Sequence, residues 1–196
     1  MADSLYLSLW FPGFEPEEML PRLVAVLRQF PFSAKEPGVT YVSVQPVDWT
    51  EQSVLERRFT PSATPEEAAD AVGELVHDDY AIAFETYWDL WSPDDQGAWT
   101  QRPSKVLFIA HGKQFDEGAY TESGHIQIDF GLDYAFLHEE VELDSETAQK
   151  VKYNVAKLVA FTQALEKNVN LTGRVLWSES DENLAQKLIS RLQRVQ

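Results

Sequence analysis

The clearest hydrophobic pattern in the chain is the alternation of residues 78–93, which read DDYAIAFETYWDLWSP. Successive side chains of an extended strand point to opposite faces, so this segment predicts a β-strand with two different faces. One face has the composition of a core and carries Tyr80, Ile82, Phe84, Trp88 and Leu90. The other face combines carboxylates with large aromatic rings and carries Ala81, Ala83, Glu85, Tyr87, Asp89 and Trp91. The second face favours contact with a ligand or partner over simple exposure to water.

The segments before this strand show a mixture of strand and helix patterns. Strands are predicted at residues 5–11, 39–47 and 53–60. Apolar residues at helical spacing predict a helix over residues 16–30. A second helix begins at Thr64, which forms a capping box with Glu67, and it ends near His77. The resulting β-α-β-β-α-β order is that of ferredoxin-like proteins.

The segments after the long strand add further strands and then helices. Strand patterns recur at residues 105–111, 124–133 and 174–177. Apolar residues at three- and four-residue steps predict a helix from Asp144 or Ser145 to about Asn168. A final helix is expected to begin at Ser180, with an apolar stripe of Leu184, Leu188, Leu192 and Val195. Because no linker separates these parts, we expect residues 1–196 to form a single α+β domain, with helices on one face of a mainly antiparallel sheet.

A polar segment, residues 92–104, connects two of the predicted strands. It is long for a hairpin, which predicts a functional or mobile loop. Trp91 and Trp99 flank this segment, so we expect their rings to be exposed and to anchor a binding partner. The remaining tryptophans next to apolar segments are expected in the core, namely Trp10, Trp49, Trp88 and Trp177.

Charge changes this picture, because the chain contains 32 acidic and 16 basic side chains and has a net charge of −16. Residues 1–149 hold 28 acids and 8 bases, a net charge of −20, whereas residues 150–196 hold 4 acids and 8 bases, a net charge of +4. A body this acidic repels phosphate backbones, so we expect no binding to nucleic acid and attraction to a basic protein. The plainer interpretation is that the acidity only keeps the protein soluble.

Several classes of protein are disfavoured by composition and motifs. The chain has no cysteine, which excludes disulfides, thiolate catalysis and cysteine metal sites. It begins without a secretion signal and has no apolar run near the ~20 residues that span a bilayer, so we expect a cytoplasmic protein without membrane contact. Gln114 and Leu107 stand where a Walker A motif requires Ser or Thr and Gly, and His138-Glu139 lacks the zinc-protease spacing. The Rossmann and nucleophile-elbow motifs are absent, and we expect no cofactor.

One group of residues has catalytic potential. Alternation places His125 and Asp129 on one face of their predicted strand. If that strand lies near residues 78–93, then Glu85 and Asp89 can share the face, and a histidine with carboxylates can bind a divalent metal or act as acid and base. The same alternation is typical of an antiparallel sheet with one wet face. Within one strand Glu85 and Asp89 are ~13 Å apart, so a carboxylate pair would need two strands.

The leading functional hypothesis is a non-enzymatic binding protein, of the inhibitor or immunity type, that masks a basic protein partner. Its candidate binding residues are Glu85, Tyr87, Asp89, Trp91, Trp99, His125 and Asp129. The alternative is a metal-dependent or acid/base enzyme, or a small-molecule binder, that uses the histidine–carboxylate face. No catalytic residue or metal ligand can be assigned from the sequence. A third hypothesis is a homodimer that buries Tyr87 and Trp91.

Overall fold

A computed structural model of the chain describes residues 3–137 and 144–179. Within these residues the protein is an α+β fold with one seven-stranded antiparallel sheet and five α-helices, which confirms the predicted fold class. The predicted final helix from Ser180 and the His138-Glu139 pair lie outside the described residues.

The elements match most of the predicted segments. The strands are β1 (Ser4–Trp10), β2 (Val39–Pro46), β3 (Leu55–Ala63), β4 (Tyr80–Pro93), β5 (Trp99–His111), β6 (Ile126–Leu132) and β7 (Gly173–Ser178). The helices are α1 (Pro16–Leu27), α2 (Pro65–Val72), α3 (Tyr120–Ser123), α4 (Tyr134–Leu137) and α5 (Ser145–Asn168), with 3-10 turns η1 (Gly73–Leu75) and η2 (Phe115–Gly118). Local sequence explains the longer helices, because Thr64 and Glu67 form the predicted capping box of α2 and the Asp144 carboxylate accepts the Thr147 N–H at the start of α5.

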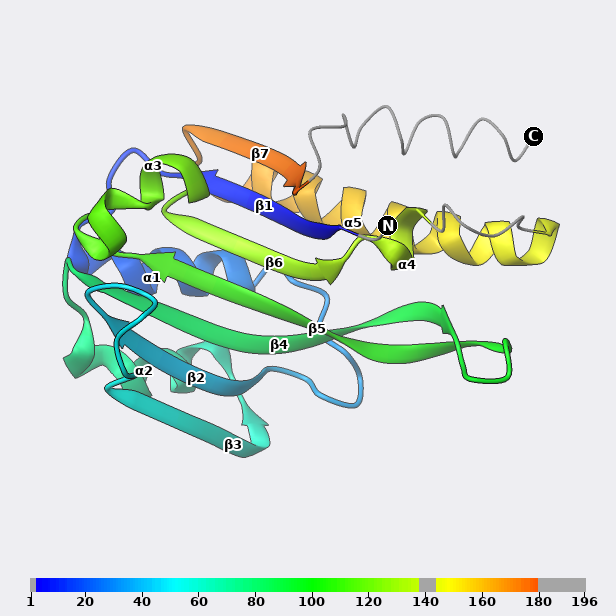
Figure 1. The fold of residues 1–196 in the computed structure, drawn as a ribbon, viewed down its shortest axis with the longest axis horizontal. Coiled ribbons are helices and arrows are strands. Elements are labelled where there is room, and N and C mark those ends of the chain that lie inside the picture. Colours follow the sequence, from blue (N-terminus) through cyan, green and yellow to red (C-terminus); the bar gives the residue numbers. More distant parts are fainter. Residues whose placement is uncertain (1–2, 138–143, 180–196) are drawn as a thin grey trace.

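The strand order in the sheet is β3-β2-β4-β5-β6-β1-β7 (Figure 1). The first four strands follow the predicted β-α-β-β-α-β order along the chain. They do not confirm a ferredoxin-like sheet, since β1 pairs with β6 and β7 while β2, β3 and β4 pair on the far side of β5. Strands from later in the chain therefore separate β1 from β2.

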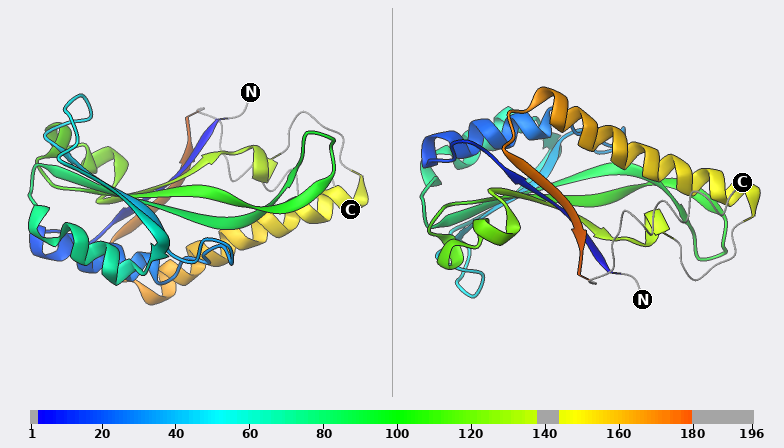
Figure 2. Two further views of the ribbon diagram at one scale, coloured as in Figure 1. Left: turned by 90° about the horizontal axis from the view of Figure 1, so that it is seen from below. Right: turned by 90° about the horizontal axis from the view of Figure 1, so that it is seen from above.

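Helices α1, α2 and α5 all cover one face of the sheet, and the described residues leave much of the opposite face, which we call the open face, uncovered (Figure 2). The core lies between this helical layer and the sheet. Trp88 is fully buried there and stacks on Phe30 and Phe130, with both ring-centroid distances 5.3 Å. The predicted core face of β4 is confirmed, because Ile82, Phe84, Trp88 and Leu90 are all buried. None of the described helices has the length and apolar character needed to cross a membrane.

The segment at residues 92–104 is not a long loop. β4 and β5 continue as a two-stranded ribbon as far as the Pro93–Trp99 pair, and only residues 94–98 turn. Asp94 stabilises that turn by accepting the backbone N–H groups of Gln96 and Ala98, each at 2.9 Å. The sequence suggested a loop because its polar residues belong to a ribbon that is mostly exposed, where a strand needs no apolar face.

The ribbon extends past the end of β2, so one edge of β4 loses its neighbouring strand after Thr86. Other elements supply hydrogen bonds to this edge. The Ser33 N–H donates to the Tyr87 carbonyl at 2.7 Å, and the Lys157 ammonium donates to the Asp89 carbonyl at 2.9 Å. The fully buried Asn154 side chain of α5 accepts the Trp91 N–H and donates to the Trp91 carbonyl. Helix α5, which runs beneath the ribbon in the left view of Figure 2, thus covers a strand edge that has no neighbouring strand.

Candidate functional site

The open face of the sheet carries one row of directly paired side chains that crosses all seven strands. In sheet order the row is Arg58, Tyr41, Glu85, Leu107, Asp129, Tyr6 and Trp177. Glu85 and Asp129 therefore do share a face, as the alternation allowed. Strands lie ~4.8 Å apart, so the backbones of Glu85 and Asp129 are ~10 Å apart, with Leu107 between them.

Glu85 is the centre of a small polar cluster on this face. Its side chain is 12% exposed and accepts hydrogen bonds from the Thr40 hydroxyl at 3.0 Å and the Tyr87 hydroxyl at 3.2 Å. The Arg58 guanidinium lies 3.7 Å from the same carboxylate. Burial, followed by the charge of Glu85, raises the pKa of Tyr87, so this phenol stays protonated and acts as a donor. The cluster is held together by hydrogen bonds and an ion pair among its own residues.

Two other predicted binding residues have internal partners. The Asp89 carboxylate accepts the Ser33 hydroxyl at 2.7 Å and the Ala34 N–H at 3.2 Å, which fixes the chain after α1. The Trp91 ring is half-buried and lies under the Lys150 ammonium, 5.2 Å from the ring centroid. Both residues therefore join the ribbon to the helical layer. Trp99 is half-buried at the tip of the ribbon, where the structure places it opposite Pro93.

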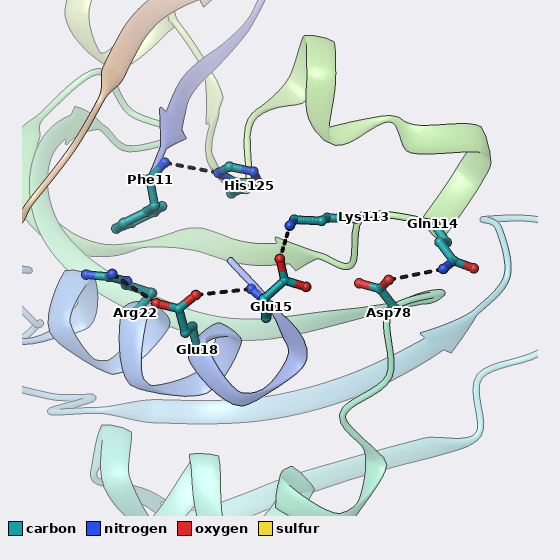
Figure 3. Close-up of polar contacts among 8 residues, drawn as sticks. All are labelled: Phe11, Glu15, Glu18, Arg22, Asp78, Lys113, Gln114 and His125. Atoms are coloured by element: carbon teal, nitrogen blue, oxygen red, sulfur yellow. Dashed lines mark hydrogen bonds and ion pairs between the residues drawn. The ribbon is translucent and has the colours of Figure 1, made fainter. Parts of the chain in front are cut away.

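His125 does not lie with the carboxylates of the open face. It is 8% exposed, its Nδ1 accepts the Phe11 N–H at 3.0 Å (Figure 3), and its ring stacks against Phe14 and Tyr120. Burial lowers the pKa of His125 to about 4, so the imidazole is neutral near pH 7. It is four residues from Asp129, or ~13 Å along the strand. Within the described residues, no group of three or more His, Asp or Glu side chains is placed to hold a metal ion.

Carboxylates gather at one end of the sheet, where β1, β2 and β5 finish and β4 and β6 begin (Figure 1). We call this region the acidic end, and its carboxylates are Asp48, Glu51, Asp78, Asp79, Asp116 and Glu117. These carboxylates come from residues 47–54, 77–79 and 112–118, and Lys113 is the only lysine or arginine in those three segments. Lys113 forms an ion pair with Glu15 (Figure 3). Hydrogen bonds from Thr50 lower the pKa of Asp48 and keep it charged. The acidic end therefore has a strong negative potential.

Trp49 stands at this acidic end and was wrongly expected in the core. It is 49% exposed, more than any of the other five tryptophans. Trp10 and Trp177 were also expected in the core but are only half-buried, whereas Trp88 is buried as expected. The β2–β3 loop that carries it projects from the open face of the sheet in the left view of Figure 2. The Trp49 ring is held on one side, because it packs nearly perpendicular to the rings of Phe115 and His111, with centroid distances of 5.0 Å and 6.1 Å. The signal available in the sequence was the acidic, polar setting of Asp48, Thr50 and Glu51 around the indole.

The backbone that supports Trp49 has an unusual conformation. Val47, Asp116 and Glu117 are the non-glycine residues with positive φ, at 61°, 47° and 55°, in the part of the chain that the structure describes. They are linked, since the Val47 N–H donates to the Asp79 carbonyl and the Asp116 N–H donates to the Val47 carbonyl. Such conformations cost L-residues about 1–2 kcal/mol each and persist only where their surroundings impose them.

The two parts of the open face differ in what they can do chemically. In the Glu85 cluster one carboxylate oxygen already contacts Thr40, Tyr87 and Arg58, whereas the acidic end offers carboxylates and a half-exposed indole to an external group. Such a combination suits a cationic surface that brings donors and apolar stems together. Comparison with protein-family models, with curated proteins and with solved structures finds no match for this chain.

Proposed function

We propose that the protein is a non-enzymatic binding protein, of the inhibitor or immunity type, whose acidic end covers a basic protein partner. The observation that carries the proposal is the exposed ring of Trp49 among the six carboxylates of the acidic end. A tryptophan that its neighbours hold in place and that is still half-exposed is the kind of side chain that forms interface hot spots.

Each component of this surface has a separate physical role in binding. The carboxylates steer a basic protein toward the acidic end and select its orientation, an effect that acts mainly on the association rate. Trp49 supplies affinity, because its exposed half can still be removed from water. Packing against Phe115 and the hydrogen-bonded backbone at Val47 hold the loop before the partner arrives, which reduces the entropy lost on binding.

The alternative of an acid/base or metal-dependent site has less geometric support. Its four residues are spread over the sheet, since Leu107 separates Glu85 from Asp129 and Asp89 binds Ser33. His125 is held by Phe11 and by stacked rings at the end of the sheet. A general acid or base needs its partner within direct hydrogen-bond reach or one water molecule away.

The proposal is tested by capture from a lysate of the source organism on immobilised protein at about 50 mM salt, where charges are poorly screened. We expect a strongly basic protein to be retained, and its dissociation constant is then measured with purified components. Trp49→Ala should weaken that affinity by about 30-fold, the effect of losing a ~2 kcal/mol hot spot. Raising the salt to about 300 mM should slow association.

The control is Asp95→Asn in the turn at the tip of the β4–β5 ribbon, which removes one exposed carboxylate at the opposite end of these strands from the acidic end. It should change the affinity by less than about twofold. The proposal fails if no basic protein is retained. It also fails if the captured protein binds Trp49→Ala and wild type equally well at both salt concentrations.

A further inference from the structure

A second aromatic feature lies on the open face beside the acidic end. A pocket of about 410 Å³ is lined by Trp10 of β1, by Val175 and Trp177 of β7, and by residues 121–123 of α3. The two tryptophans are its end walls, because Trp10 pairs with Gly173 and Trp177 pairs with Tyr6, four residues or ~13 Å further along the strands. The buried Ser8 and its partner Val175 lie between the walls.

The walls of this pocket are fixed, and their donors are already used. The Trp10 indole N–H donates to the Tyr120 carbonyl at 3.0 Å, and the Trp177 indole N–H donates to the Ser8 hydroxyl at 2.9 Å. Tyr6 stacks on Trp177 with a centroid distance of 4.6 Å and restrains that ring. Because both indole N–H groups already have acceptors, the two side chains contribute aromatic carbon surface to the pocket.

The polar groups on the α3 side of the pocket offer more acceptors than donors. The exposed Glu122 carboxylate lines the pocket, and the Thr121 hydroxyl already donates its proton to the Gly118 carbonyl at 3.0 Å, which leaves its lone pairs. The Ser123 hydroxyl can donate or accept, and no lysine or arginine is among the described residues that line the pocket. The lining therefore favours an occupant that is cationic or rich in donors and that tolerates aromatic walls.

We propose that the pocket between Trp10 and Trp177 receives an arginine side chain from the basic partner. The inference rests on the proposed function and names one residue type that the partner presents. A guanidinium is planar, carries five N–H donors and no acceptor, and stacks on indole faces, so it matches both the walls and the carboxylate. A lysine ammonium is a compact, strongly hydrated charge and uses the flat walls less well.

The position of the pocket makes it continuous with the acidic end. Segment 115–123 joins the two, since Phe115 packs against Trp49 and residues 121–123 line the pocket. Gly124 allows this segment to approach β1 closely, because a Cβ at this position would lie 2.8 Å from the Leu9 backbone nitrogen. A partner seated on Trp49 can thus present a neighbouring arginine to the pocket.

The test is a titration of the complete, isotope-labelled protein with N-acetyl-arginine amide, followed by the indole N–H resonances in NMR spectra. The Trp10 and Trp177 signals, assigned from single Trp→Phe variants, should shift saturably. N-acetyl-lysine amide should bind more weakly, and the neutral isostere N-acetyl-citrulline amide should produce no saturable shift. Glu122→Gln should weaken arginine binding about threefold, whereas Asp95→Asn at the tip of the β4–β5 ribbon should not change it.

Trp177→Leu, with folding checked by the dispersion of the remaining spectrum, should weaken arginine binding about fivefold. The inference is overturned if arginine produces no saturable shift, if citrulline produces the same shift, or if Glu122→Gln binds like wild type. The outcome is separable from that of the proposed function, because this titration needs no partner. A basic protein that binds through Trp49 and ignores Glu122→Gln would refute only the arginine pocket.

Discussion

Val47 has a φ of 61°, and at this angle a β-branched side chain crowds its own backbone. Its side chain is 51% exposed, so it gains little from burial in return. Asparagine adopts this conformation more easily. We expect Val47→Asn to raise the free energy of unfolding by about 1 kcal/mol, measured by urea denaturation.

The control for this substitution is Val54→Asn at the other end of the same loop. Val54 is 48% exposed and does not have a positive φ. The same change of side chain should therefore leave the free energy of unfolding within about 0.5 kcal/mol of wild type. An equal gain at both positions would show that backbone conformation is not the cause.

His125 links stability to pH through its lowered pKa. The folded protein holds this histidine at a pKa of about 4, whereas its ordinary value is 6.5. Between these values the unfolded chain binds more protons, so the free energy of unfolding falls as the pH drops below about 6.5. We expect this fall to be shallower in His125→Asn, which keeps an acceptor for the Phe11 N–H, in urea denaturation from about pH 7.5 to about pH 5.

Some pH dependence should persist in that variant, because burial also lowers the pKa of His111. The control is Val155→Ala, which removes buried methyl groups from α5 and no titrating group. It should lower the free energy of unfolding at every pH by a similar amount and keep the wild-type slope. Identical slopes in wild type and His125→Asn would contradict the assignment.

At the scale of elements, the Asn154 side chain makes the hydrogen bonds to β4 that a neighbouring strand would otherwise make. Asn154 of α5 makes three hydrogen bonds, two with the Trp91 backbone and one to the Ala135 carbonyl at 2.8 Å. Asn154→Ala leaves these buried groups without partners, and we expect the free energy of unfolding to fall by about 3 kcal/mol. Hydrogen exchange should also show faster exchange of the Trp91 amide, which locates the loss at the ribbon.

Asn168→Ala on the same helix is the matched control. Asn168 is exposed and donates only to the Gln29 side chain, at 2.8 Å, among the contacts within the described residues. Its removal should cost less than about 0.5 kcal/mol. If the two variants lose the same stability, then α5 is supported by packing alone and the edge contacts of β4 add nothing.

At the scale of the whole molecule, charge is distributed unevenly. The net charge of −16 repels itself, and the acidic end concentrates that repulsion in a small area. We expect the double substitution Glu51→Gln/Glu117→Gln to raise the free energy of unfolding by about 0.5 kcal/mol at low salt. In about 500 mM salt the gain should vanish, because charges are screened within a few ångströms.

The comparison for this effect is Glu146→Gln at the start of α5. Glu146 forms an ion pair with Lys150 at 2.8 Å, so neutralising it removes an attraction. It should leave stability unchanged or slightly lower at low salt. A gain of the same size at Glu146 would mean that total charge matters and that the acidic end has no special role.

Features that depend on neighbours in the sequence were accessible without the structure. The alternation in β4 located its core face, and the capping box at Thr64 located the start of α2. Alternation also suggested that Glu85 and Asp129 share a face, which the pairing through Leu107 shows. These patterns are readable because the periodicity of a strand or helix is a property of local backbone geometry.

Features that depend on contacts between distant segments were decided only by the tertiary structure. No local pattern places β5 and β6 between β4 and β1, brings Asn154 to the Trp91 backbone, or turns Trp49 outward at the acidic end. Each of these requires knowing which strand edges and ring faces other elements cover. The sequence alone determined the α+β class, the long two-faced strand and the net negative charge. Long-range strand pairing decided where the carboxylates of the acidic end and the exposed Trp49 ring come together.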